Sequence, residues 1–317
     1  TGVQTCALPI STITGAGGAD GTVSGQANDA ILAGTAEVNG TVTVKSGSAT
    51  LGTTTVGAAG TWSYALSAAN IATLGQGSGK AVSVTVTDAA GNVSSAVSTS
   101  FNVDTVAPGA PSITAVGGTD ATVSSQGGDA NVVGQTEAGS TVTLRSGSTL
   151  LGTATADNAG AWSYALTAAN LATLGQGGGK SLSATAIDAA GNVSASTASA
   201  SFGVDTVVPT VNAVAITTAT GAQNNTLNAG DVVTVTVSMS EAVTVTGTPQ
   251  LALNIGGMGR TANYVSGSGS TALLFGYTIQ AGDTDVNGIS IDANRLALNG
   301  GTIADAAGNA AALAHAA

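Results

Sequence analysis

Aromatic and charged residues are both scarce in this sequence. Aromatics make up 3% and charged residues 7% of the 317 residues. The charge is also one-sided, since seventeen Asp and Glu oppose six Lys and Arg and leave a net charge of −11. Nucleic acids and anionic membrane surfaces attract basic patches rather than acidic ones. We therefore expect neither of them as a partner, and the composition favours a soluble extracellular chain or one that collects divalent cations.

Long apolar runs and histidine are scarce as well. No apolar stretch approaches the roughly 20 residues that a helix needs to span a bilayer, so no membrane insertion is expected. His315 is the only histidine, and the sequence offers it no partners for a catalytic triad or a zinc site. The glycine-rich stretch before Lys180 precedes a predicted strand instead of opening a helix, which argues against a phosphate loop. The sequence contains no catalytic constellation, and we predict that the chain is not an enzyme.

Residues 1–10, TGVQTCALPI, differ from everything that follows and hold the only cysteine, Cys6. They read like the translation of a sequencing-adapter oligonucleotide fused to an open reading frame; a genuine strand ending in Cys6 is the alternative. We expect this segment to be non-native and the natural sequence to begin near Ser11, without cysteine. We also expect the chain to be a fragment of a longer protein, so the lack of a signal peptide is uninformative.

Glycine and small β-branched or hydroxyl residues dominate what remains. The chain has 46 Gly, and its Val, Thr and Ser favour strands joined by tight turns. In Thr41-Val-Thr-Val-Lys45, apolar and polar residues alternate as they do in a half-buried antiparallel strand. Such patterns predict strands near 11–14, 29–36, 41–46, 49–56, 61–66, 80–88 and 94–103. A short helix is predicted at Ser67–Leu74, where Ser67 caps its start and Gly75 ends it in the left-handed αL region.

A repeat of 100 residues organises the chain. Trp62-Ser-Tyr-Ala-Leu66 recurs as Trp162-Ser-Tyr-Ala-Leu166, and Asp88-Ala-Ala-Gly-Asn92 recurs as Asp188-Ala-Ala-Gly-Asn192. A divergent third copy lacks the Trp but keeps the turn as Asp305-Ala-Ala-Gly-Asn309. Turn residues separate the strands at the spacing of a sandwich. The chain is therefore predicted to be all-β, with three tandem immunoglobulin-like β-sandwich modules at 11–105, 106–206 and 207–317.

The copies also predict where their cores lie. The third module is predicted to contain strands at 232–237, 272–279 and 289–291. Trp62 and Trp162 lie in alternating strands and are expected to anchor the cores of their modules; a sugar-stacking platform is the alternative.

The second copy has smaller residues where the first has valine. Leu182, Ala184 and Ala186 stand in place of Val82, Val84 and Val86. Each lost pair of methyl groups costs about 1–2 kcal/mol unless neighbours fill the space. We therefore expect the second module to be less stable than the first.

Three stretches carry a family resemblance. They are Gly34-Thr-Ala-Glu37 with Thr41–Val44, the turn Thr87–Asn92, and the linker Asp104-Thr-Val-Ala-Pro108. These stretches resemble bacterial immunoglobulin-like repeats of giant surface adhesins, many of them of the type I-secreted, biofilm-associated class. The third module, with Ser240–Gly247 and Tyr264–Gly269, is similar to another Ig-like module of such proteins.

The resemblance implies a function for the repeats. In such adhesins they are extenders that hold a distal binding domain away from the cell, and calcium at the module junctions stiffens them. The resemblance also implies a secreted or cell-surface location. Neighbouring modules of the same chain are the implied partners, and surface glycans or host or biofilm components are candidate ligands. This is an analogy at the level of the fold.

Acidic residues fall where the junctions of such modules would place them. In an Ig-like sandwich, the B–C and F–G loops lie at the pole that receives the linker from the preceding module. The first junction would gather Asp104, Glu137, Asp188 and Asn192, the second Asp205, Glu241, Asp305 and Asn309, and Glu37, Asp88 and Asn92 would form half a site. Calcium prefers six to eight oxygen ligands, and such a set supplies several. We predict calcium at the junctions; alternatively, Asp-Ala-Ala-Gly-Asn is simply a hairpin loop in which Asp caps its own backbone.

A second calcium candidate lies in the third module. Asp283-Thr-Asp285-Val-Asn287-Gly288 matches the first half of an EF-hand loop. Asn294 stands where that loop requires a bidentate Glu, and helical flanks are absent. A polar turn between strands is therefore favoured over weak calcium binding.

We hypothesise that the chain is an extender or stalk segment of a secreted or surface-anchored adhesin. One alternative is a set of accessory modules from a secreted polysaccharide-active enzyme, which a catalytic domain elsewhere in the full-length gene would favour. Another is a glycan- or protein-binding role for the third module. Solvent-exposed aromatics around Tyr264, Phe275 and Tyr277 would favour that role.

Overall fold

The computed structural model describes residues 11–224 and 226–317. The expectations for Cys6 and the rest of residues 1–10 lie outside the described residues. Within the described ranges no helix is long and apolar enough to cross a membrane. The chain divides into two compact units: one holds the chain up to Ile113, Val133–Tyr164 and Leu182–Ala198, and the other holds Thr114–Val132, Ala165–Ser181 and Ser199–Ala317. The predicted boundaries of three modules stay a prediction.

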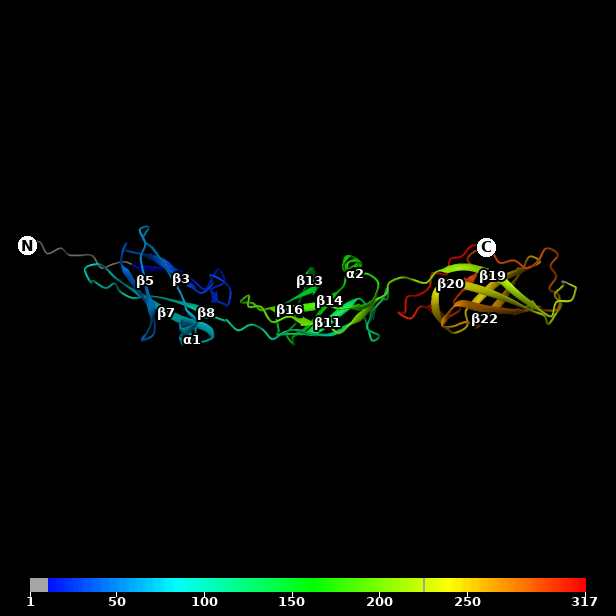
Figure 1. The fold of residues 1–317 in the computed structure, drawn as a ribbon, viewed down its shortest axis with the longest axis horizontal. Coiled ribbons are helices and arrows are strands. Elements are labelled where there is room, and N and C mark those ends of the chain that lie inside the picture. The colour runs from blue at the N-terminus through cyan, green and yellow to red at the C-terminus, as the bar shows by residue number, and fades with distance from the viewer. Residues whose placement is uncertain (1–10, 225) are drawn as a thin grey trace, which may run out of the picture. The chain divides into compact units, whose positions relative to one another are not determined.

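The first repeat folds as a β-sandwich (Figure 1). One sheet has the order β1–β3–β6, formed by Ser11–Ala16, Ile31–Ala36 and Thr61–Ala65. The facing sheet has the order β2–β8–β7–β4–β5, formed by Thr22–Val23, Val97–Val103, Gly77–Thr87, Thr41–Ser46 and Ala49–Thr55. All pairs are antiparallel except β2 with β8, which is parallel. The predicted strands are confirmed, and the two-residue β2 is an addition to them.

Alternation along the strands builds the core of this sandwich. Val42 and Val44 of β4 and Val84 of β7 are fully buried, while the Thr residues between the valines are half-buried or exposed. Trp62 of the opposite sheet belongs to the same apolar cluster and is 3% exposed. Trp162 is also 3% exposed. Both Trp residues are therefore core anchors as predicted, and the alternative of a sugar-stacking platform is wrong.

The predicted helix is present in both repeats. It comprises Ala68–Leu74 (α1) and Ala168–Leu174 (α2), with Ser67 and Thr167 as N-caps that accept a hydrogen bond from the backbone of the residue three positions on. The helix ends at a glycine, but not in the αL region. Gly75 has φ 69° and ψ 165°, a combination that is open essentially to glycine alone.

The second repeat contains the same strands in shorter form. Two sheets have the orders β13–β12–β16–β17 and β10–β18–β15, and three further strands have the order β14–β11–β9. In chain order the strands are β9 Ser112–Val116, β10 Thr122–Val123, β11 Asn131–Gln135, β12 Thr141–Ser146, β13 Thr149–Thr155, β14 Ala161–Ala165, β15 Gly177–Lys180, β16 Ser183–Ile187, β17 Thr197–Ala198 and β18 Phe202–Val204. Where the first repeat has the continuous β7, the second has β15 and β16 with a break at residues 181–182.

One substitution partly offsets the smaller residues of the second repeat. Ala184 lies opposite Leu144 on β12, whereas the matching pair in the first repeat is Val84 and Val44. Leucine has one more carbon than valine, so Leu144 replaces part of the lost volume at that pair. No larger residue compensates for Ala186 at its cross-strand pair, since Ala186 faces Val142 just as Val86 faces Val42. Of these two alanines, Ala186 therefore keeps the larger loss of volume.

Exchanging the residues at this position should change stability in opposite directions. Ala186 and Val86 are both fully buried. We expect Ala186→Val to stabilise the second repeat and Val86→Ala to destabilise the first, each by about 1–2 kcal/mol. Urea unfolding followed by tryptophan fluorescence measures both, because each repeat holds one of the two Trp residues. A loss of stability in Ala186→Val would mean that neighbours already fill the site, since overpacking also destabilises.

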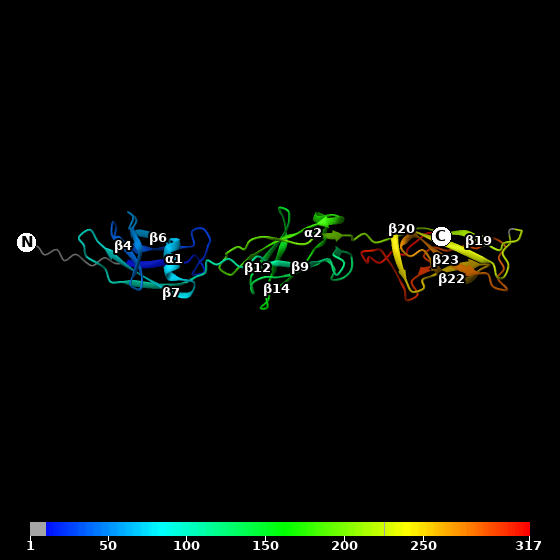
Figure 2. The ribbon, with the colours of Figure 1, turned by 60° about the horizontal axis from the view of Figure 1, so that its bottom comes forward.

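The third part of the chain is built around a larger sheet. Its strands are β19 Val211–Thr220, β20 Val232–Thr246, β21 Gln250–Ile255, β22 Met258–Ser266, β23 Ser270–Thr278 and β24 Leu296–Ala297, with β25 Thr302–Ala304 paired to β20. Their order is β19–β20–β23–β22–β21–β24, and Figure 2 shows β19, β20, β23 and β22 of this sheet. Two predicted strands are confirmed in β20 and β23. Residues 289–291 contribute only an isolated bridge between Ser290 and Asn254.

Candidate functional site

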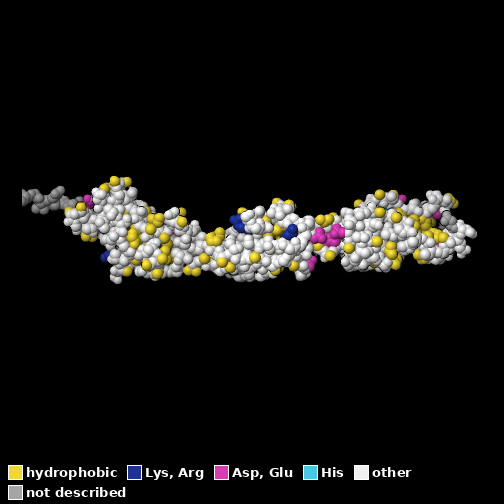
Figure 3. Space-filling model, viewed as in Figure 1, with side chains coloured by type: hydrophobic (Ala, Val, Ile, Leu, Met, Phe, Trp, Pro, Cys, Tyr) yellow, Lys and Arg dark blue, Asp and Glu magenta, His cyan; other side chains and the backbone are white. Residues whose placement is uncertain are grey.

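Three carboxylates that the sequence assigns to the second junction lie together in the structure. Asp205 follows β18, Glu241 lies in β20, and Asp305 follows β25. One carboxylate oxygen from each lies within 4.8 Å of the others. Within residues 11–224 and 226–317 this is the one group of three or more potential ligands of this kind. Figure 3 shows few charged side chains on this face, with several acidic side chains (magenta) gathered in one patch.

Backbone pairing fixes where each carboxylate lies. The amide of Asp205 donates to the carbonyl of Val123 at 2.9 Å, which continues the pairing of β18. Asp305 opens the turn to Asn309, whose backbone N–H donates to Asp305 Oδ1 at 2.8 Å. Asp305 thus caps its own turn, as the alternative interpretation of this loop proposed. Together with the bond from Asn309 Nδ2 to Oδ2, this means that each carboxylate oxygen of Asp305 accepts one of the described hydrogen bonds, which leaves lone pairs for a ligand role.

Glu241 is not in a loop, contrary to the sequence prediction. It lies inside β20, between Ser238 and Val243, which both pair with β23, and just before the pairing with β25 begins at Thr244. The pairing of β20 with β23 shifts register between Ser238 and Val243. The shift is a local irregularity of the kind that re-aims a side chain next to a site. It places Glu241 beside the other two carboxylates.

The charges of the group affect one another. The pKa of Glu241 is raised above its usual 4.5, first because burial penalises the charged form and then because Asp305 and Asp205 repel a third negative charge. Within the described residues neither Lys nor Arg forms an ion pair with the group; the ion pairs found there join Arg260 to Asp283 and Arg295 to Asp292. The arrangement is thus one that a cation would relieve.

Asn309 lies in the group, but its amide oxygen is occupied. Its Oδ1 accepts a hydrogen bond from the backbone N–H of Ser125 at 2.6 Å. Its Nδ2 donates to Asp305 Oδ2 at 2.8 Å and to the carbonyl of Asp205 at 2.9 Å. In this arrangement Asn309 holds two carboxylate-bearing residues in position. Its predicted role as a direct ligand stays a prediction.

The first junction repeats part of this arrangement. Asn192 Nδ2 donates to the carbonyl of Asp104 at 2.8 Å and to Asp188 Oδ2 at 3.0 Å, and Asn192 Oδ1 accepts from the N–H of Gly25 at 2.7 Å. Glu137 lies in the turn after β11 and is exposed. Among the residues that the structure describes, Asp104, Glu137 and Asp188 do not form a group of three potential ligands. Calcium at this junction stays a prediction.

Residues on the other side of both junctions were not predicted from the sequence. Gly25 and Ser125 belong to two matching tripeptides, Ser24-Gly-Gln26 and Ser124-Ser-Gln126. The 100-residue repeat contains this signal, but its polar residues suggest no more than a turn.

The EF-hand-like segment is a turn that uses its carboxylates internally. Asp283 accepts from Arg260 Nε at 2.7 Å, Tyr277 Oη at 2.7 Å and the N–H of Gln280 at 2.9 Å. The backbone N–H of Gln280 and the Tyr277 hydroxyl, with burial opposing them, hold the pKa of Asp283 below its usual value. Asp285 accepts from the N–H groups of Gly256, Asn287 and Gly288, which lower its pKa as well.

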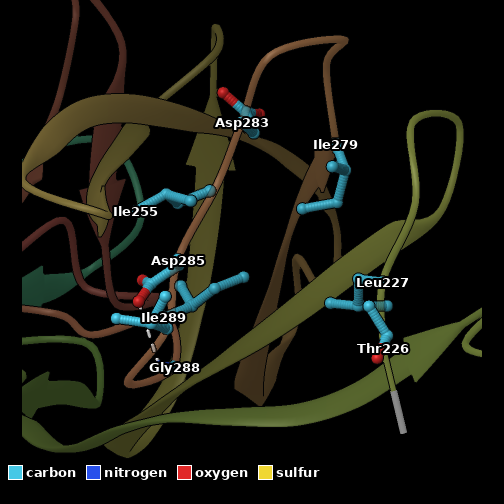
Figure 4. A pocket seen from close by; sticks show the side chains of 9 residues that line it. Thr226, Leu227, Ile255, Ile279, Asp283, Asp285, Gly288 and Ile289 are labelled. Carbon is cyan, nitrogen blue, oxygen red and sulfur yellow. Dashed lines mark hydrogen bonds between the residues drawn. The ribbon is translucent and has the colours of Figure 1, made fainter. Parts of the chain in front are cut away.

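Both Asp residues line a cavity of about 390 Å³. Leu227, Ile255, Ile279 and Ile289 supply its apolar walls (Figure 4). Because N–H and O–H donors already bind the two carboxylates, the cavity does not present them as free calcium ligands. The interpretation as a polar turn, favoured from the sequence, therefore accounts for this segment.

The aromatic residues of the third part do not form a platform for sugars. Phe275 is fully buried and Tyr277 is 9% exposed. Tyr264 is half-buried, packs edge-on against Phe275 with ring centroids 5.8 Å apart, and accepts a hydrogen bond from the N–H of Ser268. The exposed aromatics that would favour glycan binding are therefore not found at these three positions.

A profile of the bacterial Ig domain matches residues 19–102 and 107–202. These matches cover more than half of the 317 residues. The chain belongs to the bacterial Ig domain family. The family resemblance proposed from the sequence is thereby confirmed, and so is the fold of immunoglobulin-like β-sandwich domains. No catalytic family is among the matches, and no curated protein matches the chain.

Solved structures similar to this bacterial Ig domain protein include three multidomain chains. One, from a study of host cell surface retention of a 1.5-MDa bacterial ice-binding adhesin, is 22% identical, with 86% of this chain and 88% of that chain covered and a TM-score of 0.33. The fibronectin(III)-like modules of Clostridium thermocellum CbhA are 13% identical, with 62% and 95% covered and a TM-score of 0.36. Titin domains I67–I69, in an E-to-A mutated variant, are 10% identical, with 95% of each chain covered and a TM-score of 0.36.

Proposed function

We propose that this chain is an extender segment of a secreted or surface-anchored bacterial adhesin, and that calcium binds where its Ig domains join. The group of Asp205, Glu241 and Asp305 carries the proposal. The three residues come from the linker and from two separate elements of the third module. A cation bound by all three would tie the linker to the domain that follows it.

Calcium suits this set of ligands better than other common ions. It is a hard cation that takes six to eight oxygens, and carboxylates, carbonyls and water supply them. Zinc and copper prefer imidazole or thiolate ligands. Among the described residues the group consists of three carboxylates and contains no His or Cys. Asn309 supports the site by holding Asp305 and the carbonyl of Asp205.

Thermal unfolding in millimolar calcium and in a chelator tests the proposal. Extracellular calcium modules bind with Kd of about 10⁻⁴–10⁻³ M, so a tenfold excess over Kd adds about 1.4 kcal/mol per site. That gain raises the Tm by several degrees for a domain of about 100 residues. We expect calcium to raise the Tm of the third module, measured by calorimetry.

Two substitutions make the measurement specific. Asp205→Ala should abolish the calcium-dependent rise, while Asp292→Ala should preserve it, since the Asp292 side chain is 54% exposed and lies outside the group. Asp104→Ala tests the first junction in the same way. Identical melts with and without calcium would overturn the calcium part of the proposal and leave a string of Ig domains whose stability does not depend on metal.

A further inference from the structure

A loop of the same structure occurs in both repeats, between β2 and β3 and between β10 and β11. In the first repeat, the N–H and Oγ of Ser24 donate to Asp29 Oδ2 at 2.8 and 2.5 Å, and the N–H of Gln26 donates to Ser24 Oγ at 3.2 Å. The second repeat has the same three bonds at 2.8, 2.5 and 3.3 Å, made by Ser124, Asp129 and Gln126. The loop is therefore held in one conformation by its own side chains.

Each of these loops lies against the Asp-Ala-Ala-Gly-Asn turn of the module that follows. In the first unit, the N–H of Gly25 donates to Asn192 Oδ1 at 2.7 Å and Gln26 Nε2 donates to the carbonyl of Ala190 at 3.4 Å. In the second unit, the N–H of Ser125 donates to Asn309 Oδ1 at 2.6 Å and Gln126 Nε2 donates to the carbonyl of Gly308 at 2.9 Å. The third module is divergent in sequence, yet its Asn309 receives the loop through the same amide oxygen as Asn192. The Gln bond is to the carbonyl one position further along the turn, at Gly308 instead of the position equivalent to Ala190.

The Asn side chain forms a two-point bridge to the preceding module. Its oxygen accepts from the loop, and its nitrogen donates to the carbonyl of the linker Asp, at 2.8 Å for Asn192 and Asp104 and at 2.9 Å for Asn309 and Asp205. Asn192 and Asn309 are 5% and 0% exposed. A buried amide satisfied on both sides fixes the position of the groups that it joins.

Glycine in the turn makes the close approach of Gln possible. A Cβ at Gly191 would overlap the amide of Gln26, with Gln26 Cδ only 2.8 Å away, and a Cβ at Gly308 would overlap the amide of Gln126 in the same way. Gly91, in the first copy of the turn, has nearly the same φ, +89° against +85° for Gly191, but no described atom lies within 4 Å of its Cβ position. Among the described residues, a Gln side chain thus lies against the turn in two of its three copies.

We propose that the Asp-Ala-Ala-Gly-Asn turn is a docking site for the Ser-X-Gln loop of the preceding module, and that this amide clamp joins the modules without metal. Its bonds use neutral amides and backbone groups, so neither calcium nor a particular charge state is required. The partner that fits the turn is a module of the same family whose loop between its second and third strands carries Ser-X-Gln.

Amide hydrogen exchange on the full chain in a chelator tests the clamp directly. The reporter is the peptide around Gly25, whose N–H donates to Asn192 across the junction. We expect Asn192→Ala to raise the exchange rate of this peptide about tenfold, as expected for the loss of one well-formed hydrogen bond. Asn92→Ala is the matched control, because Asn92 makes the same bonds to Asp88 within its turn but none of the described bonds to a preceding loop.

Two further measurements keep the test decisive. A peptide from β12 reports whether Asn192→Ala leaves the second repeat folded, and Gln26→Ala disturbs the clamp without altering the turn. The proposal is overturned if the Gly25 peptide of the wild-type chain exchanges in chelator as fast as in Asn192→Ala, or if Asn92→Ala has the same effect. Protection that appears only with calcium would also overturn it, while leaving the calcium site of the proposed function intact.

Discussion

Replacing Gly34 by alanine is expected to destabilise the first repeat by about 2–4 kcal/mol. Gly34 lies in the central strand of the β1–β3–β6 sheet, opposite Ile13 on one side and Trp62 on the other. A Cβ there would come within 2.7 Å of Trp62 Cε2 and closer still to the carbonyl oxygen of Thr12. The backbone oxygen cannot move aside as a flexible side chain can, so either the strand pairing or the Trp packing must give way.

The two Trp residues let this effect be assigned to one repeat. Because Trp62 and Trp162 are the only ones in the chain, Gly34→Ala should move about half of the fluorescence change to a lower Tm, by roughly 10 °C or more. Gly134→Ala should do the same to the other half, since its Cβ would meet the carbonyl of Ser112 and the ring of Trp162. Gly15→Ala is the control, as Gly15 lies in the same sheet but has nothing within 4 Å of its Cβ position.

Equal Tm values for Gly34→Ala and the wild-type chain would contradict this account of the sandwich. They would mean that the Trp ring does not lie against the backbone of β3. The glycine would then be explained by turn or strand preferences alone. The Gly34-Thr-Ala-Glu37 motif, which carried the resemblance to bacterial Ig repeats, has its physical basis in this contact if the large effect is observed.

Strands with a buried face were predictable, and strands without one were not. Thr41–Ser46 was predicted with its bounds correct because the buried Val42 and Val44 alternate with polar residues. Thr22–Val23 was missed because two residues show no periodicity, and it exists only through its parallel pairing with β8. Val211–Thr220 was missed because most of its side chains are exposed, so its residues carry no apolar alternation.

The candidate site, too, contains residues that could be predicted from the sequence and residues that could not. Asp205 and Asp305 could be predicted from the repeat. Asp205 begins the linker and Asp305 begins the Asp-Ala-Ala-Gly-Asn turn, and both segments recur in the copies. Glu241 was expected in a loop, since the sequence around it does not indicate that β20 continues through this position with a register shift in its pairing with β23. The occupied oxygen of Asn309 could not be predicted either, because the bond to Ser125 joins residues 184 positions apart in the chain.

Asn309 belongs to the clamp and also contacts the carboxylate group. Asn309 links the Ser124-Ser-Gln126 loop to the turn and at the same time holds the carboxylate of Asp305. Docking of the loop therefore orders one of the proposed calcium ligands before any ion binds. A ligand set that is already ordered loses less entropy on binding, so the clamp should strengthen calcium binding at this junction.

Glu241→Gln is expected to have opposite effects in calcium and in chelator. In calcium, loss of one of three carboxylates should weaken binding at least about tenfold and remove most of the rise in Tm. In chelator at pH 7, the variant should be as stable as the wild-type chain or more so, because ionised Glu241 is repelled by Asp305 and Asp205. Glu37→Gln is the control, since it removes the same charge from an exposed bend of the first repeat that lies outside the group.

The pH dependence of stability in chelator tests whether ionised Glu241 destabilises the folded chain. The pKa of Glu241 is raised above its usual 4.5 in the folded chain, so the folded state holds this proton more tightly than the unfolded state. Stability from this group is therefore present at low pH and is lost as the pH rises through the folded-state pKa. The advantage of Glu241→Gln over the wild-type chain should be largest near pH 7 and should vanish below pH 4.5, where Glu241 is protonated. Calorimetry of both chains between pH 4 and 7 measures the difference, and an advantage that grows on acidification would show that repulsion among the three carboxylates does not set the stability of this junction.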